Sequence, residues 1–368
     1  MNIKLPIINT LMTFVFLSIL SIQTVAFPVI YDTDMAIDDW FALLYLAKNK
    51  DSELKAVTIS CSGESHCGPG ESNVISLLDL IKSQAPIPVA AGDAYPLDGY
   101  FVFPEKWQKD SDTLSGVPIA KPSYAPSDLS AVELLHTTIS QSGEPVTIIA
   151  VGPLTNIAQW LMAYPDDAKN VSRLVIMGGS LDAKGNIIVP GFTTNHPNKK
   201  AEWNLFVDPL SAKIVFDSTL AIELVGLDVT NHVNVTHDYV AHFSTLANTP
   251  EAKFADQVYK KNDWFIDSGE YYFWDVLAAL TATHPELCVP EVTALNIGIE
   301  IVKEPKHLDT SDLSIPKLRW DGKPRSHLNA ATAGVISRSK TGQPISVCMQ
   351  TNAEKALKIF TDTLTVEQ

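Results

Sequence analysis

Apolar residues along the chain follow two alternating patterns. Short runs rich in β-branched residues are each followed by a longer stretch whose apolar residues recur at helical spacing. The pairs, in chain order, are FPVIYDT with DDWFALLYLAKN, LKAVTISC with ESNVISLLDLIKS, and VTIIAVG with LTNIAQWLMAY; RLVIMGG and, further on, AIELVGLDV are additional strand-like runs. This alternation predicts an α/β domain with an open, mostly parallel sheet and helices on both faces.

Polar motifs follow several of these strand-like runs. Asp32 and Asp34 end the first run, VGPLTN (151–156) follows the third, and MGGS (177–180) follows the fourth. Ligands of open α/β sheets bind beyond the carboxyl ends of the strands. The sequence therefore predicts a polar binding site at that edge of the sheet.

Three segments interrupt the alternation and are rich in Pro, Gly and polar residues: 95–127, 181–201 and 303–345. No low-complexity linker or internal repeat divides the chain. We expect one domain over residues 27–368, with these segments as loop insertions and a last helix in AEKALKIFTDTL.

The first 26 residues have the pattern of an export signal. Lys4 supplies a positive start, LMTFVFLSILSI is too short to span a bilayer, and TVA provides small residues before Phe27. We predict cleavage near Phe27, no membrane attachment afterwards, and a secreted or periplasmic protein. An uncleaved signal anchor is the alternative.

Charge and cysteine content narrow the choice of partners. The net charge is −15 and no basic stripe is present, which disfavours nucleic acid and anionic membranes and favours a small neutral or cationic ligand or a metal ion. The four cysteines have no CxxC spacing, which disfavours zinc. Export predicts two disulfides, Cys61–Cys67 and Cys288–Cys348, with buried free thiols as the alternative.

Four carboxylates are crowded into DTDMAIDD, residues 32–39. Asp32 and Asp34 end a strand on one face, and Asp38 and Asp39 open the next helix. Like charges this close either become protonated or are neutralised by a cation. Calcium is the cation that best tolerates many oxygen ligands in irregular geometry. The spacing is not that of an EF-hand, and a DxD phosphatase leaves Asp38 and Asp39 unexplained.

The motif DTDMAIDD resembles the DxDxxxDD signature of the inosine-uridine type nucleoside hydrolases. Further blocks agree in the family's order up to about residue 280: VGPLTNIA, VIMGG, AEWNLFVDP, LDVT and FWDVLAA. The resemblance implies a Rossmann-like nucleoside hydrolase fold, one bound Ca²⁺, and hydrolysis of ribonucleosides to ribose and free base. By analogy it also implies a homo-oligomer.

The resemblance assigns roles to the carboxylates. It makes the side chains of Asp34, Asp39 and Asp275 and the backbone carbonyl of Thr155 the calcium ligands, with ribose hydroxyls and a water completing the shell. Asp34 is also implied to be the general base that takes the proton of that water. Asp38 is implied to hold the ribose 2′-hydroxyl.

Other matched residues are implied to bind the rest of the sugar, namely Glu202 and Asn204. Asp32 is expected to support the loop from behind. Because cleavage of an N-riboside builds positive charge on the ribose ring, a pocket walled with carboxylates suits its transition state.

The base-binding part departs from the commonest family pattern. Trp274 stands where many members carry a His that protonates the leaving base. The resemblance is then closer to the purine-preferring branch, where an indole stacks on the protonated purine. The second aromatic wall is expected from residues 95–107, with Trp107, Phe103, Phe101 and Tyr95 as candidates.

Two sugar-contacting positions also depart from the pattern. Glu64 in TISCSGES replaces an Asn, and Phe192 in VPGF replaces the Asn of VPGN. Asn195, or alternatively Asn198, is the candidate to replace the lost contact as a substrate-binding residue. His196 is the alternative leaving-group acid.

The predicted function is calcium-dependent, purine-leaning hydrolysis of nucleosides. The alternative from another class is an exported nucleoside-binding protein without turnover. Retention of Asp34 favours the enzyme, because sugar binding alone needs no general base.

Overall fold

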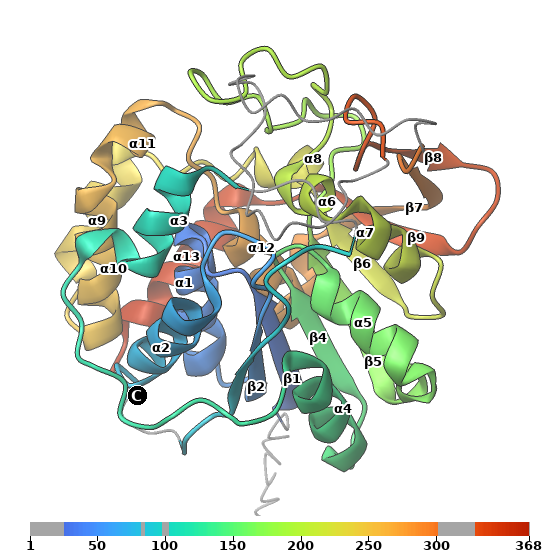
Figure 1. Ribbon diagram of the computed structural model, residues 1–368. Coiled ribbons are helices and arrows are strands. Elements are labelled where there is room, and N and C mark those ends of the chain that lie inside the picture. Colours follow the sequence, from blue (N-terminus) through green and yellow to red (C-terminus); the bar gives the residue numbers. More distant parts are fainter. Residues whose placement is uncertain (1–25, 82–84, 98–102, 301–327, 368) are drawn as a thin grey trace, which may run out of the picture.

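The computed structural model describes residues 26–81, 85–97, 103–300 and 328–367. Within these residues a central nine-stranded sheet has the order β3-β2-β1-β4-β5-β6-β9-β7-β8 (Figure 1). The neighbouring strands from β3 to β9 run parallel, whereas β7 is antiparallel to both β9 and β8. The strands are β1 Phe27–Thr33, β2 Ser52–Ile59, β3 Val89–Ala91, β4 Val146–Ala150, β5 Val171–Met177, β6 Ile222–Val225, β7 Val289–Ile297, β8 Ile336–Ser339 and β9 Pro344–Gln350.

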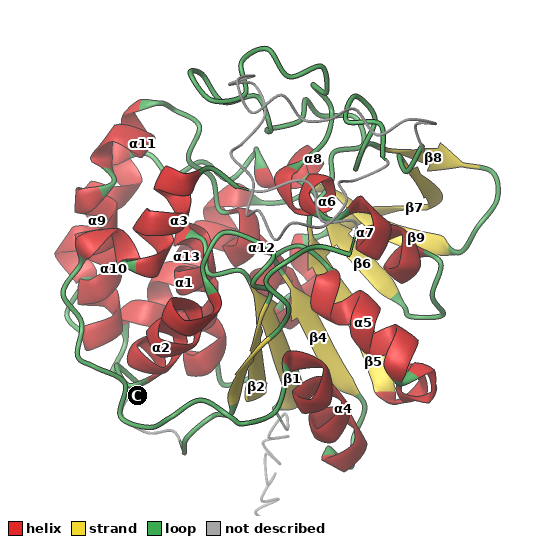
Figure 2. Ribbon diagram, in the orientation of Figure 1, coloured by secondary structure: helices red, strands yellow, loops and turns green. Residues whose placement is uncertain are grey.

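Helices cover both faces of this sheet (Figures 1 and 2). The helices of one side are α1 Ile37–Lys48, α2 Cys67–Leu78, α3 Glu105–Asp112, α9 His237–Leu246, α10 Pro250–Lys261, α11 Asp263–Asp267, α12 Trp274–Thr283 and α13 Ala353–Thr365. The opposite face carries α4 Ala131–Gln141, α5 Thr155–Ala163 and α7 Pro209–Phe216. Short helices α6 Trp203–Val207 and α8 Leu227–Thr230 follow the carboxyl ends of strands, and 3₁₀ turns are η1 Leu114–Gly116, η2 Pro165–Asn170 and η3 Pro285–Leu287.

Two apolar cores lie on the two faces of the sheet. Successive side chains of β1 alternate between them: Val29 and Tyr31 pack in the core with α1 and α12, and Ile30 packs in the core with α4 and α5. Because the central strands are buried on both sides, they read as nearly continuous apolar runs. Burial of each such side chain contributes about 1.5–3 kcal/mol.

The predicted α/β architecture is confirmed, with differences in three places. The run AIELVGLDV is a strand only as far as Val225, after which LDVT forms α8. The predicted insertion 95–127 contains the helix α3 and the turn η1. The prediction that 303–345 is irregular is wrong at the end of that segment, because Ile336–Ser339 and Pro344 belong to antiparallel strands. Residues 301–327 lie outside the described residues.

Both predicted disulfides, Cys61–Cys67 and Cys288–Cys348, are formed. In the part of the chain that the structure describes, no helix combines the length and the apolar character needed to cross a membrane. The predicted export signal, residues 1–26, lies outside that part except for Ala26, so export stays a prediction.

Candidate active site

A cavity of about 480 Å³ lies at the carboxyl ends of the central strands. Its floor includes Asp34 after β1, Glu64 after β2, Val151 after β4 and Met177 at the end of β5. These positions are where the strand pattern predicted a polar site. We call four of its lining residues the carboxylate cluster: Asp34, Asp38, Asp39 and Asp275. We call six of its lining rings the aromatic set: Phe103, Trp107, Trp203, Trp264, Phe265 and Trp274.

A sharp turn between β1 and α1 gathers the carboxylates. Met35 has a φ of 60°, in the left-handed region that non-glycine residues adopt at a cost of about 1–3 kcal/mol. Its N–H donates to Thr33 Oγ1 at 2.9 Å and to Asp39 Oδ1 at 3.2 Å. Its carbonyl accepts from Trp40 Nε1 at 2.8 Å. These bonds hold the turn that brings Asp34 and Asp39 to one cavity.

Three buried carboxylates lie close enough together to share an ion. One oxygen each of Asp38, Asp39 and Asp275 falls within 4.8 Å of the others. The backbone N–H of Asp275 donates to Asp38 Oδ2 at 3.1 Å, while Asp39 Oδ2 is buried without a hydrogen-bond partner in the described structure. No Lys, Arg or His is among the described residues that line the cavity. Three buried carboxylates placed in this way could hold a cation.

The electrostatics of the cluster agree with that conclusion. Burial raises the pKa of Asp38 to about 7, and that of Asp39 to about 6. Burial and repulsion from Asp38 and Asp39 raise the pKa of Asp275 well above its usual range. A divalent ion reverses these shifts by favouring the charged carboxylates. Hard oxygen donors at irregular spacing fit calcium.

Asp34 lies beside this trio rather than within it. Its Oδ2 accepts a hydrogen bond from the Glu64 N–H at 3.0 Å, and its side chain is enclosed by two glycines. A Cβ on Gly63 or Gly152 would lie 2.3 or 2.8 Å from Asp34 Cβ, so only glycine permits this approach. Burial and the charges of Asp39 and Glu64 raise the pKa of Asp34 well above its usual range. The close trio therefore contains Asp38, for which the sequence predicted a ribose contact, while the role of Asp34 as a calcium ligand stays a prediction.

Thr155 and Asp32 lie behind the cavity. Thr155 begins α5, is buried, and donates from Oγ1 to Asp208 Oδ2 at 2.7 Å; it is not among the cavity-lining residues. Asp32 Oδ2 accepts from Thr58 Oγ1 at 2.6 Å and from Asn156 Nδ2 at 2.7 Å. Asp32 thus joins β1 to β2 and α5, which is the supporting position expected for it.

The predicted sugar-binding residues Glu202 and Asn204 line the cavity. The carboxylate of Glu202 caps α6 by accepting from Asn204 N–H at 2.8 Å, and accepts from Gly179 N–H at 2.9 Å. Asn204 Nδ2 donates to the Val151 carbonyl at 2.8 Å. These bonds orient both side chains from the ends of β4 and β5.

Glu64 also lines the cavity, and its carboxylate is tied to the insertion helix α3. Ser111 Oγ donates to Glu64 Oε1 at 2.7 Å. Burial raises the pKa of Glu64 to about 8 despite this bond. The departure from the family pattern at this position therefore connects the strand-end loop to α3.

The aromatic set forms two groups of rings. Trp107 packs edge-on against Trp203 with ring centroids 5.7 Å apart, and Phe103 stacks on Trp203 at 5.0 Å. Trp274 packs on Phe265 at 5.8 Å, next to the half-exposed Trp264. The predicted residues Trp107 and Trp274 therefore belong to different groups of the same cavity. Phe101 lies outside the described residues, and Tyr95 does not line the cavity.

The structure does not bring Asn195 to the cavity. Asn195 is exposed, and in the preceding turn Thr193 Oγ1 accepts from the Val189 N–H at 2.8 Å, which keeps the loop bonded to itself. Asn198 donates to the Ala333 carbonyl at 2.8 Å as part of the scaffold. Neither Phe192 nor the buried His196 is among the cavity-lining residues.

Sequence reasoning missed several residues that line the cavity: Asp110, Ser115, Asn186, Trp203, Asn262 and Glu270. Trp203 stands between the two predicted sugar-binding residues in AEWN, and this adjacency was a usable signal. The others come from insertions or helix ends, where no strand or helix periodicity indicates which side chain faces inward.

Comparisons with known proteins agree with this geometry. A family model described as inosine-uridine preferring nucleoside hydrolase matches residues 29–358. The pyrimidine-specific ribonucleoside hydrolase RihA of Salmonella enteritidis is 32% identical over 256 residues, which cover 69% of this chain and 76% of that protein.

Solved structures share the fold at lower identity. An inosine-uridine preferring nucleoside hydrolase from Bacillus anthracis has a TM-score of 0.70 at 23% identity, covering 92% of this chain and 100% of that one. A purine-preferring ribonucleoside hydrolase from Gardnerella vaginalis has a TM-score of 0.69 at 21% identity, covering 92% and 98%.

Proposed function

The chain belongs to the inosine-uridine preferring nucleoside hydrolase family, and from that premise we propose that it is a calcium-dependent hydrolase of the N-glycosidic bond of ribonucleosides, with Asp34 as general base. The observation that carries the proposal is the buried trio of Asp38, Asp39 and Asp275 within 4.8 Å, in a cavity whose described lining has no basic residue.

Asp38, Asp39 and Asp275 are the residues that would hold the ion by their side chains. We keep Asp34 and the carbonyl of Thr155 as further ligands on the basis of the family resemblance. A bound calcium ion supplies positive charge that orients the ribose hydroxyls and lowers the pKa of a nearby water.

Asp34 then accepts a proton from the attacking water. The Glu64 N–H and the enclosing glycines fix its carboxylate, so that it is positioned before the substrate arrives. Asp38 accepts from a ribose hydroxyl. The buried negative charges stabilise the positive charge that develops on the ribose ring as the base departs.

We propose that the aromatic set holds the base and favours purines. Trp274 offers no proton at neutral pH, and an indole face stabilises a protonated purine by cation–π attraction. The Salmonella relative is named as pyrimidine-specific, which makes pyrimidine preference the rival hypothesis. The cavity of about 480 Å³ has room for either base.

A substrate panel tests both levels of the proposal. Inosine, adenosine, guanosine, uridine and cytidine are incubated with the calcium-loaded protein, and release of free base is measured. We expect turnover, highest for the purines, and a loss of about 10²–10⁴-fold in the Asp34→Asn variant. Tight binding without turnover would instead support the nucleoside-binding protein, and a uridine optimum would support the rival base preference.

We further propose that the protein is exported and loses residues 1–26. The support is the charge and apolar pattern of that segment. N-terminal sequencing of the protein recovered from outside the cytoplasm is expected to begin near Phe27; a retained Met1 would contradict cleavage.

A further inference from the structure

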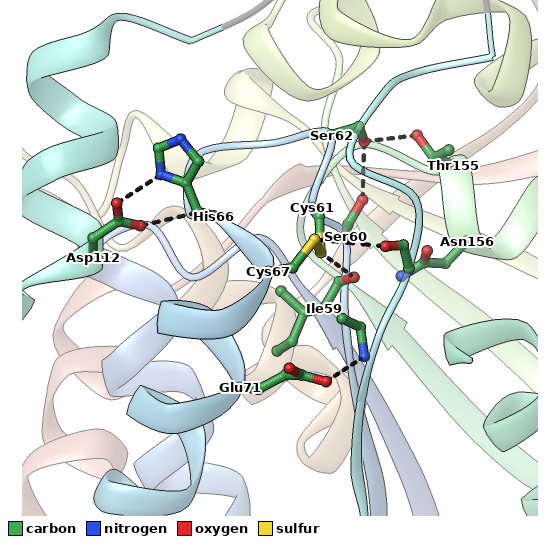
Figure 3. The surroundings of a disulfide bond; sticks show 12 residues. Ile59, Ser60, Cys61, Ser62, His66, Cys67, Glu71, Asp112, Thr155 and Asn156 are labelled. Atoms are coloured by element: carbon green, nitrogen blue, oxygen red, sulfur yellow. Dashed lines mark hydrogen bonds and ion pairs between the residues drawn. A yellow bond between two sulfur atoms is a disulfide. The ribbon is translucent and has the colours of Figure 1, made fainter. Parts of the chain in front are cut away.

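The disulfide Cys61–Cys67 closes a ring of the chain between β2 and α2, with a sequence separation of 6 residues (Figure 3). Five residues lie inside the ring; His66 is exposed, whereas Ser62, Gly63, Glu64 and Ser65 are buried. Each of the four buried residues contacts the active site or the residues behind it.

Three of these contacts are made with Asp34. The Glu64 N–H donates to Asp34 Oδ2 at 3.0 Å, and the Ser65 N–H donates to the Asp34 carbonyl at 2.9 Å. Gly63 packs so closely on the Asp34 side chain that any Cβ would collide with it. The ring therefore fixes both the backbone and the carboxylate of the proposed general base.

The remaining contacts join the ring to neighbouring elements. Ser62 Oγ and Thr155 Oγ1 are hydrogen-bonded at 2.8 Å, as Figure 3 shows. Ser111 Oγ on α3 donates to Glu64 Oε1 at 2.7 Å. The ring thus connects the ends of β1 and β2 with α5 and α3.

We propose that the Cys61–Cys67 disulfide is a positioning element of the active site, so that catalysis depends on its oxidised state. The segment Ser62–Gly63–Glu64–Ser65 contains a glycine and short polar side chains, which leave the open chain many conformations. The covalent bond removes most of them and keeps two N–H donors aimed at Asp34. This inference rests on the proposed role of Asp34.

The second disulfide provides a matched control. Cys288–Cys348 has a sequence separation of 60 residues and joins the residue before β7 to β9, and neither cysteine is among the cavity-lining residues. A cross-link that closes a longer loop removes more conformational freedom from the unfolded chain. We therefore expect Cys288–Cys348 to contribute mainly to stability and Cys61–Cys67 mainly to turnover.

Chemical reduction gives a second way to remove the bond. Cys61 is fully buried, but Cys67 begins α2 beside the exposed His66 and is itself only partly buried. Dithiothreitol can reduce the bond by two successive thiol exchanges; the two cysteine thiols form as dithiothreitol is oxidised to its cyclic disulfide. Two electrons and two protons pass from the reagent to the protein.

The test compares two double variants of the full chain with calcium present: Cys61→Ser/Cys67→Ser and Cys288→Ser/Cys348→Ser. Inosine and uridine turnover and the thermal midpoint are measured for each. We expect the first variant to lose about tenfold or more in kcat with KM changed less than about threefold, since a positioning loss acts on the chemical step. We expect the second to keep kcat and lose thermal stability.

A double-mutant cycle keeps the proposal falsifiable. If the bond acts through Asp34, its removal in an Asp34→Asn background has no further effect on kcat, because the two changes affect one interaction. Should the serine variant fail to fold, dithiothreitol treatment of the folded Cys288→Ser/Cys348→Ser protein, with and without Asp34→Asn, replaces it, because Cys61–Cys67 is then the one disulfide left to reduce. A variant without the bond that keeps the wild-type kcat would overturn the proposal. So would a loss of kcat on removing the bond that is as large in the Asp34→Asn background as in the wild type.

Failure of the proposed function gives a different result. An oxidised wild type that hydrolyses no riboside contradicts the hydrolase proposal itself. In that case the calcium-induced rise of the thermal midpoint is the second measurement. If this rise is lost in the Cys61→Ser/Cys67→Ser variant but kept in the Cys288→Ser/Cys348→Ser variant, the result supports positioning of the site. An equal rise in the two variants argues against it.

Discussion

The carboxylate cluster and the aromatic set line the same cavity but are built in different ways. Asp34 directly follows the central strand β1 and Asp39 lies in the first turn of α1, and both are fully buried, whereas Trp264 of the aromatic set is 54% exposed on a short helix. Several hydrogen bonds fix the carboxylates, while the rings rest mainly on one another. In the proposed function, the chemistry common to all ribosides would thus rest on groups next to the central sheet, and recognition of the base on rings from helices and loops around it.

The largest expected effect tests the carboxylate cluster. Replacing Asp39 by Asn removes the charge of a carboxylate whose Oδ2 has no hydrogen-bond partner among the described residues. The substitution should lower kcat/KM about 10³-fold for purine and pyrimidine ribosides alike. Glu270→Gln, which changes an exposed acid of the same cavity, is the control and should stay near wild type. A loss for one class of base only would break the division between the two regions.

Calcium and pH test the same cluster through stability. Because burial raises the pKa of Asp38 to about 7 and of Asp39 to about 6, the folded metal-free chain retains protons that the unfolded chain has released. Its free energy of unfolding should therefore fall as the pH rises from about 4 to 7.

Calcium should reverse this trend. At pH 8 an ion concentration 100-fold above its Kd should stabilise the protein by about 2.7 kcal/mol, and at pH 5 by less, since protons compete for the carboxylates. Thermal unfolding at both pH values, with calcium and with a chelator, measures the difference. Equal stabilisation at the two pH values would argue against calcium binding by these carboxylates.

The next effect tests the aromatic set. Trp274→Ala should lower kcat/KM about tenfold for purine nucleosides and much less for a nitrophenyl riboside, whose leaving group needs no protonation. Parallel assays of inosine and the nitrophenyl riboside give the ratio. Equal losses on the two substrates would mean that Trp274 supports the neighbouring Asp275 and not the base.

The smallest effect concerns the insertion helix. Trp107→Ala removes one edge-on ring contact with Trp203 and should raise the KM for inosine about threefold with little change in kcat. Steady-state kinetics separates the two constants. A large fall in kcat would show that α3 affects the carboxylate cluster through Ser111 and Glu64.

The sequence predicted the carboxylate cluster better than the aromatic set for a physical reason. Buried parallel strands impose continuous apolar runs, so the place where β1 ends, and hence Asp34, could be found from the pattern alone. The helix α3, by contrast, has a single apolar residue, Trp107, within EKWQKDSD, and such a helix leaves no periodic signal.

The outer edge of the sheet was missed for a similar reason. In β7 the residues Val289 and Val292 are 54% and 68% exposed, so the apolar positions of this strand do not mark a buried face. Asn195 could not be placed either, because the path of its loop depends on hydrogen bonds within the loop itself, such as that from the Val189 N–H to Thr193 Oγ1. The presence of Asp38 in the close trio depends on how the side chains of the turn and of α12 are placed, which no motif specifies.

The hydrogen bond from the Asp275 N–H to Asp38 joins residues 237 positions apart. During synthesis, β1 and α1 emerge long before α12, so the trio of Asp38, Asp39 and Asp275 is completed only after most of the chain is available. Contacts of such long range form late in folding, because the intervening chain must first be ordered. If the proposed calcium binding holds, affinity for the ion therefore reports completed folding, and a chain that ends before α12 should not bind it.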